Sequence, residues 1–124
     1  MLTLPSAVRI YLCAEPVDMR KGIDGLSSLV CGALRLDVFS GHVFVFLGRR
    51  PTRVKLLFWD RGGFVLVQKR LERGRFQRPS VSSEATTVSL DATTLTMLLD
   101  GIDVRGVRRP AAWTPPSAST ARQA

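Results

Sequence analysis

Residues 42–70 read HVFVFLGRRPTRVKLLFWDRGGFVLVQKR, and this stretch decides the fold because three strand-like segments follow one another across two short turns. The segments 42–47, 53–59 and 64–69 are rich in valine, phenylalanine and leucine, residues that favour strands. The connections GRRPT and DRGG have the length and the residue types of hairpin turns. The stretch therefore predicts an antiparallel meander.

The turn lengths predict the register of this meander. A second turn centred on Arg61-Gly62 places Trp59 opposite Phe64, and a five-residue first loop places Leu47 opposite Arg53. One face is then almost wholly apolar and should pack under a helix; it comprises Phe44, Phe46, Val54, Leu56, Phe58, Val65 and Val67. The other face mixes Val43, Val45, Leu57, Trp59, Phe64 and Leu66 with Arg53, Lys55, Gln68 and Arg70. A slip of one residue would exchange these sets.

Further elements are expected on either side of the meander. Residues 9–13 have strand composition, and apolar residues at helical spacing predict a helix from Met19 with Asp18 as its N-cap. A short strand is expected over 86–90, followed by a helix over 92–100 with Asp91 as N-cap and Gly101 as the stop. We expect one α+β domain over residues 1–107, built on an antiparallel β-meander of three to five strands. One main helix should cover one face, and a short C-terminal helix should follow. The Pro/Ser/Ala-rich tail, residues 108–124, is expected to be disordered.

The positive charge of the chain is concentrated in residues 49–79. Ten basic side chains stand there against only Asp60 and Glu72, a net charge of +8 that equals the charge of the whole chain. The ten are Arg49, Arg50, Arg53, Lys55, Arg61, Lys69, Arg70, Arg73, Arg75 and Arg78. Charge concentrated in this way attracts a polyanion far more strongly than the same charge spread evenly. The segment therefore predicts association with nucleic acid.

Composition also bears on location and on other partners. An anionic membrane surface is the weaker interpretation, because the basic residues follow a strand-and-turn pattern and not an amphipathic helix. No apolar run approaches the roughly 20 residues of a spanning helix, and the N-terminus lacks a signal-peptide layout. We expect a cytoplasmic protein without membrane partners.

The residues that commonly carry catalysis are sparse. His42 is the single histidine, and no serine lies in a nucleophile-elbow pattern. Cys13 and Cys31 form no metal-binding spacing and are expected to be buried, reduced thiols. The acidic residues show no convergence that would hold Mg²⁺. We therefore expect that the protein is not an enzyme and that it binds no metal and no cofactor.

Two groups of residues are candidates for contacts. The first group is expected to bind nucleic-acid phosphates and consists of Arg20, Lys21, Arg49, Arg50, Arg53, Lys55, Lys69, Arg70, Arg73, Arg75 and Arg78. The aromatic side chains Trp59, Phe64 and Phe76 are candidates for base stacking or for contact with a partner protein. The alternative for Trp59 and Phe64 is a second small core under the C-terminal helix. For Arg20-Lys21, phosphate contact at a helix N-terminus and pairing with Glu15 or Asp18 explain the sequence equally well.

Four motifs in order add a resemblance. They are MRKGIDGL at 19–26, VFVF at 43–46, KLLFWD with GF at 55–64, and KRLERGRF at 69–76. The chain closely resembles the TnpB accessory proteins of bacterial insertion sequences of the sixty-six family, strongly over 8–79 and more loosely over 90–103. These are unrelated to the RNA-guided nucleases that share the name. Gln68 stands where the family often has an aromatic residue, and Gln77-Arg78 replaces a more apolar pair.

The resemblance implies a bacterial, nucleoid-associated protein with a role in transposition beside a separate, larger transposase. The expected function is that of a non-catalytic accessory protein that binds DNA, at element ends or non-specifically, and assists the transposase. The alternative is a protein-interaction module that docks on the transposase or on a second copy of itself, without DNA contact. A homo-oligomer is thus among the expected partners.

Overall fold

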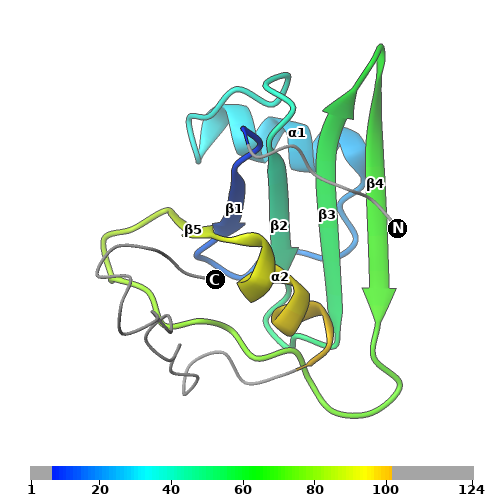
Figure 1. Cartoon of the computed structure of the whole chain (residues 1–124), viewed down its shortest axis with the longest axis vertical. Coiled ribbons are helices and arrows are strands. Elements are labelled where there is room, and N and C mark those ends of the chain that lie inside the picture. Colours follow the sequence, from blue (N-terminus) through cyan, green and yellow to red (C-terminus); the bar gives the residue numbers. More distant parts are fainter. Residues whose placement is uncertain (1–6, 102–124) are drawn as a thin grey trace, which may run out of the picture.

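The computed structural model describes residues 7–101, in which five strands and two helices follow one another (Figure 1). Their bounds are β1 Ile10–Cys13, α1 Ile23–Gly32, β2 Val43–Leu47, β3 Arg53–Asp60, β4 Gly63–Arg70, β5 Thr87–Leu90 and α2 Ala92–Leu99. The α+β class is confirmed. The tail expected to be disordered, residues 108–124, and the end of the predicted domain lie outside the described residues.

The five strands form one mixed sheet in the order β4-β3-β2-β1-β5. The strands β2, β3 and β4 pair antiparallel, as the turns predict, and β5 pairs antiparallel with β1. The prediction of a purely antiparallel sheet is wrong, because β1 pairs in parallel with β2. Two parallel neighbours need a crossover connection, and α1 lies within that connection here.

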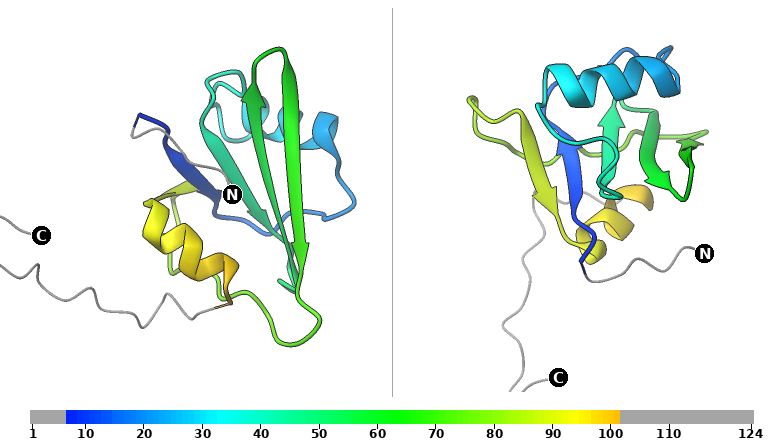
Figure 2. Two further views of the ribbon diagram at one scale, coloured as in Figure 1. Left: turned by 45° about the vertical axis from the view of Figure 1, so that its right-hand side comes forward. Right: turned by 90° about the horizontal axis from the view of Figure 1, so that it is seen from above.

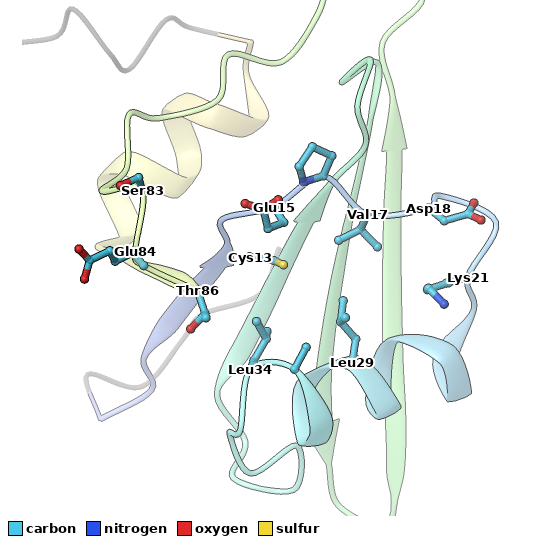
Figure 3. A pocket seen from close by; sticks show the side chains of 13 residues that line it. Cys13, Glu15, Val17, Asp18, Lys21, Leu29, Leu34, Ser83, Glu84 and Thr86 are labelled. Carbon is cyan, nitrogen blue, oxygen red and sulfur yellow. The ribbon is translucent and has the colours of Figure 1, made fainter.

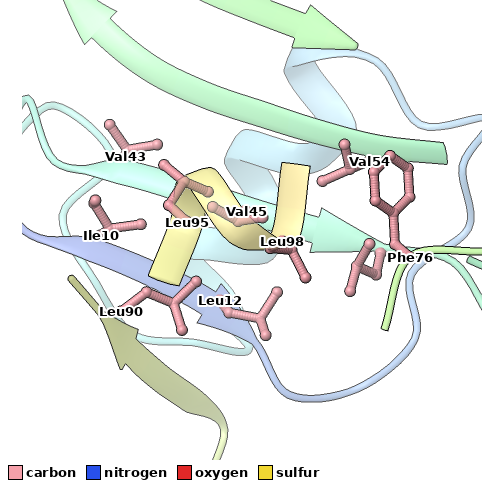
Figure 4. Close-up of a cluster of buried hydrophobic side chains, with 10 residues drawn as sticks. Ile10, Leu12, Val43, Val45, Val54, Phe76, Leu90, Leu95 and Leu98 are labelled. Carbon is pink, nitrogen blue, oxygen red and sulfur yellow. The ribbon is translucent and has the colours of Figure 1, made fainter. Parts of the chain in front are cut away.

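A helix covers each face of the sheet, where the sequence predicted a covering helix on one face only (Figure 2). The α1-side core contains Cys13, Val17, Leu26, Val30, Leu34, Val38, Phe44, Phe46 and Leu57. The α2-side core, drawn in Figure 4, contains Ile10, Leu12, Val43, Val45, Leu47, Val54, Phe76, Leu90, Leu95 and Leu98. The short second helix therefore closes a core of its own.

The register of the meander is partly as expected. Trp59 pairs with Phe64, as predicted, but Leu47 pairs with Val54 and not with Arg53. Phe44 and Phe46 consequently share the α1 face with Leu57, and the expected apolar face is divided between the two sides. All five residues of β2 are buried, so its sequence has no polar positions that could reveal which side chains face which helix.

The helix ends differ in how well the sequence indicated them. Asp91 caps α2 as predicted, because its side chain accepts a hydrogen bond from the Thr94 N–H at 2.7 Å. Gly101 follows α2 with a φ of +79°, the left-handed conformation that makes glycine a helix stop. The prediction for α1 is wrong. The helix begins at Ile23 with Gly22 as its N-cap, while the Asp18 carboxylate binds Arg20 instead.

The cap of α2 gives a direct test of this end of the fold. Asp91→Ala should lower the free energy of unfolding by about 1 kcal/mol, since a first-turn N–H then loses its acceptor. Asp91→Asn keeps an acceptor and should change stability by only a few tenths of a kcal/mol. Urea denaturation of both variants measures the difference. Equal losses in the two variants would contradict a capping role.

Candidate nucleic-acid interface

Two basic loops meet at one end of the sheet, the lower end in Figure 1. The β2–β3 connection and the segment after β4 are held together because the Leu71 N–H donates to the Thr52 carbonyl at 2.8 Å. The Phe76 N–H likewise donates to the Pro51 carbonyl at 2.6 Å. The adjoining strands contribute a pair of arginines, because Arg53 lies opposite Arg70 in the register. We call residues 49–53 and 69–75 together the basic end.

Five arginines of the basic end are exposed and free to bind a ligand. Within residues 7–101, their guanidinium groups make no hydrogen bond or ion pair. They are Arg49, Arg50, Arg53, Arg73 and Arg75. Exposed guanidinium groups on two joined loops are suited to neutralising phosphates, which they can also bind through paired N–H donors.

Two more cations of the basic end have partners in the protein. Lys69 donates from Nζ to the Leu99 carbonyl at 2.7 Å, at the C-terminus of α2, where a positive charge is favoured. Arg70 forms an ion pair with Glu72 at 2.9 Å, with both side chains largely exposed. Both cations add to the local field, although each also has a contact within the fold.

Lys55 and Arg78 do not belong to the exposed set that the sequence predicted. Lys55 is 7% exposed and donates from Nζ to the Lys21 carbonyl at 2.7 Å. Arg78 is half-buried and donates to the carbonyls of Leu47 and Gly48, and burial lowers its pKa. Because both cations face the backbone, they position neighbouring segments and are not available to phosphates in this conformation.

Arg20 and Lys21 lie before α1 and not in its first turn. The guanidinium of Arg20 binds the carboxylate of Asp18 at 2.8 Å and holds the pKa of that carboxyl well below its usual range. Of the two explanations, the geometry thus shows the pairing with Asp18. The segment nevertheless lies beside the basic end, because a Cβ on Gly48 would come within 2.9 Å of the Met19 side chain.

None of the aromatic candidates is exposed among the basic loops. Phe76 is 1% exposed and packs in the α2-side core, so it is not available for stacking. Trp59 and Phe64 pair at the β3–β4 turn, at the other end of the hairpin from Arg53 and Arg70. Eight residues of strand separate the two ends by about 25 Å.

A third aromatic residue, which the sequence did not indicate, completes the cluster at this turn. Phe39 is 58% exposed, and its ring lies 5.0 Å from that of Trp59 and 5.5 Å from that of Phe64. Trp59 and Phe64 are themselves in edge-to-face contact at 5.0 Å. They are half-buried on the α1 side, so the expectation of a core under the C-terminal helix is wrong.

A cavity of about 350 Å³ lies between the β1–α1 connection, α1 and residues 83–86 (Figure 3). Its lining is mainly apolar, with the carboxylates of Glu15, Asp18 and Glu84 against the single ammonium of Lys21. The net charge of the ionisable side chains that line the cavity is therefore negative, opposite to that of the basic end, and does not attract an anion. Cys13 also lines the cavity, and burial raises the pKa of its thiol.

Other site types are not assembled within the described part of the chain. No group of three or more His, Cys, Asp or Glu side chains in residues 7–101 is placed to hold a metal ion. Neither helix there is long and apolar enough to cross a membrane. His42, the single histidine, accepts a hydrogen bond at Nδ1 from the Arg9 N–H at 3.0 Å.

The fold and the site define a small α+β protein with a two-sided mixed sheet and a basic end built from two joined loops. Residues 8–109 match the family described as "IS66 Orf2 like protein". The chain belongs to this family of insertion-sequence accessory proteins, and the resemblance seen in the sequence is confirmed. The family is not a known catalytic one.

Two curated relatives are both proteins of Sinorhizobium fredii (strain NBRC 101917 / NGR234). The protein named "Uncharacterized protein y4jC" is 38% identical over 102 residues, which cover 82% of this chain and 86% of the relative. "Uncharacterized protein y4hO" is 38% identical over 104 residues, covering 82% and 89% respectively. No solved structure gives a significant match.

The burial of Phe76 can be tested against the exposure of Phe39. Phe76→Ala should lower the free energy of unfolding by about 3–5 kcal/mol, the usual cost of removing a buried aromatic ring. Phe39→Ala should cost clearly less, because its ring is mostly exposed and loses mainly aromatic pair contacts, worth about 0.5–1.5 kcal/mol. Chemical denaturation gives both values. A smaller loss for Phe76→Ala than for Phe39→Ala would contradict the assignment of Phe76 to the core.

The two cysteines should differ in reactivity. Cys31 is exposed, so the expectation that both thiols are buried is wrong for Cys31. Cys13 is buried with a raised thiol pKa, so the thiolate that reacts is scarce there. The native protein should therefore react rapidly with iodoacetamide at Cys31 alone, and Cys31→Ser should abolish rapid labelling. Mass spectrometry after brief treatment locates the adduct. Equal labelling of both thiols in the folded protein would refute the difference.

Proposed function

We propose that the chain is a DNA-binding accessory protein of insertion-sequence transposition. The observation that supports the proposal best is the basic end, where two hydrogen-bonded loops present exposed, unpaired arginines. The four arginines of these loops each lie within two residues of a residue whose backbone holds the loops together, namely Pro51, Leu71 or Phe76. The positions of the charges are therefore set by the fold.

The contacts proposed here are with the sugar-phosphate backbone. Guanidinium groups on loops neutralise phosphates and release counterions, which provides affinity without reading base sequence. The basic end contains no exposed aromatic side chain among the described residues, so base stacking has no platform there. Element ends would then be distinguished by the transposase or by DNA shape, and the accessory protein would contribute affinity.

Salt dependence tests the proposal. In fluorescence-anisotropy titrations, the logarithm of the affinity should fall linearly with log salt, by about 0.9 per neutralised phosphate on duplex DNA. Element-end and unrelated duplexes of equal length should give similar slopes. A folded protein that binds neither duplex between about 50 and 200 mM salt would contradict DNA binding.

A matched pair of variants tests the location. Arg50→Gln/Arg73→Gln removes one exposed arginine from each basic loop, and Arg9→Gln/Arg35→Gln removes two exposed arginines elsewhere. The first variant should reduce the salt slope by about 1.8, and the second should leave it close to that of the unaltered protein. Thermal unfolding of both variants checks the fold. Equal effects of the two variants would mean that net charge, and not the basic end, determines binding.

A further inference from the structure

We infer that a second copy of this chain docks on the end of the sheet opposite the basic end, through the cluster of Phe39, Trp59 and Phe64. We call this cluster, with the neighbouring turn residues Asp60 and Arg61, the aromatic end. The inference goes beyond DNA binding and does not depend on it. It concerns a surface that the proposed function leaves unused.

The exposure of Phe39 is imposed by the fold. The preceding residue Val38 is 1% exposed and packs in the α1-side core, and the Asp37 side chain accepts a hydrogen bond from the Phe39 N–H at 2.9 Å. The ring therefore lies outward against Trp59, on a loop that is anchored at Val38 and Asp37. An exposed aromatic ring packed against a tryptophan is typical of the centre of a protein–protein interface.

The charges near the cluster favour protein over nucleic acid. Residues 35–39 and 59–64 contain two arginines and two aspartates, so their net charge is zero, whereas the basic end carries the excess. A polyanion is therefore attracted to the other end, about 25 Å away along β3.

The same charges make the surface complementary to itself. Asp60 and Arg61 are adjacent and exposed at the turn, and neither side chain forms an ion pair within residues 7–101. In a twofold contact, each surface meets an identical surface in reverse, so Arg61 of each copy can face Asp60 of the other. Two opposite pairs would then flank the joined aromatic rings.

The position of the basic end removes the main obstacle to pairing. Two chains of charge +8 repel one another, but a contact through the aromatic ends keeps the two basic ends roughly 50 Å apart. This separation exceeds the Debye length of about 8 Å at physiological salt several times, so the repulsion is largely screened. Such a dimer would present a basic end on each side.

Sedimentation velocity on the full chain without DNA, over a wide concentration range at physiological salt, tests the inference. The unaltered protein should show a concentration-dependent monomer–dimer equilibrium, and Phe39→Ser should weaken the dimer by about tenfold or more. The control Val67→Ser removes an exposed apolar side chain of β4, opposite Leu56 on the α2 side, and should have no effect. A monomer at every concentration would overturn the inference, as would a dimer that is lost with Val67→Ser but kept with Phe39→Ser.

Charge reversal gives a second, independent measurement. Asp60→Arg and Arg61→Asp should each prevent self-association, because like charges then face one another across the twofold axis. An equimolar mixture of the two variants should form a heterodimer, since the opposite charges are restored between unlike chains. Recovery in the mixture excludes misfolding as the cause of either loss. Homodimers that persist in both single variants would overturn the proposed arrangement.

Discussion

Burial of β2 on both faces is the constraint on which the rest of this structure depends. All five of its residues are removed from water, between β1 and β3 in the sheet and between α1 and α2 above and below it. A strand without polar positions requires apolar cover on each side. The chain supplies one helix before β2 and one after β5, and between β4 and β5 it must pass to the opposite edge of the sheet.

That route determines where the charge is placed. β4 and β5 are the two edge strands, so residues 71–86 must pass across four strand spacings, roughly 19 Å. The passage begins under the β2–β3 connection, where two backbone hydrogen bonds hold it and Phe76 enters the α2-side core. The arginines between these attachment points are exposed and project into water. The position of the basic end is thus a consequence of the path that the chain takes from β4 to β5.

The β3–β4 hairpin separates two surfaces of different chemistry. Its type I′ turn, with positive φ at Arg61 and Gly62, places Trp59 and Phe64 at one end, and the paired Arg53 and Arg70 occupy the other. A small accessory protein can use such a division to keep an electrostatic contact and an apolar contact from competing. The chain belongs to a family of insertion-sequence accessory proteins, and its two surfaces differ in charge and in apolar character.

The sequence by itself determined the α+β class, the hairpin and its register, the cap at Asp91 and the concentration of charge, because turns, caps and composition act over short distances. Tertiary structure alone decided the rest. The parallel pairing of β1 depends on long-range packing, and so does the choice of which β2 side chains face α1 and which face α2. An all-apolar strand reveals neither. Packing also buried Lys55 and Phe76 and brought Phe39 to Trp59 from a distant loop. Charge and composition are properties of residues, whereas accessibility is a property of the folded chain.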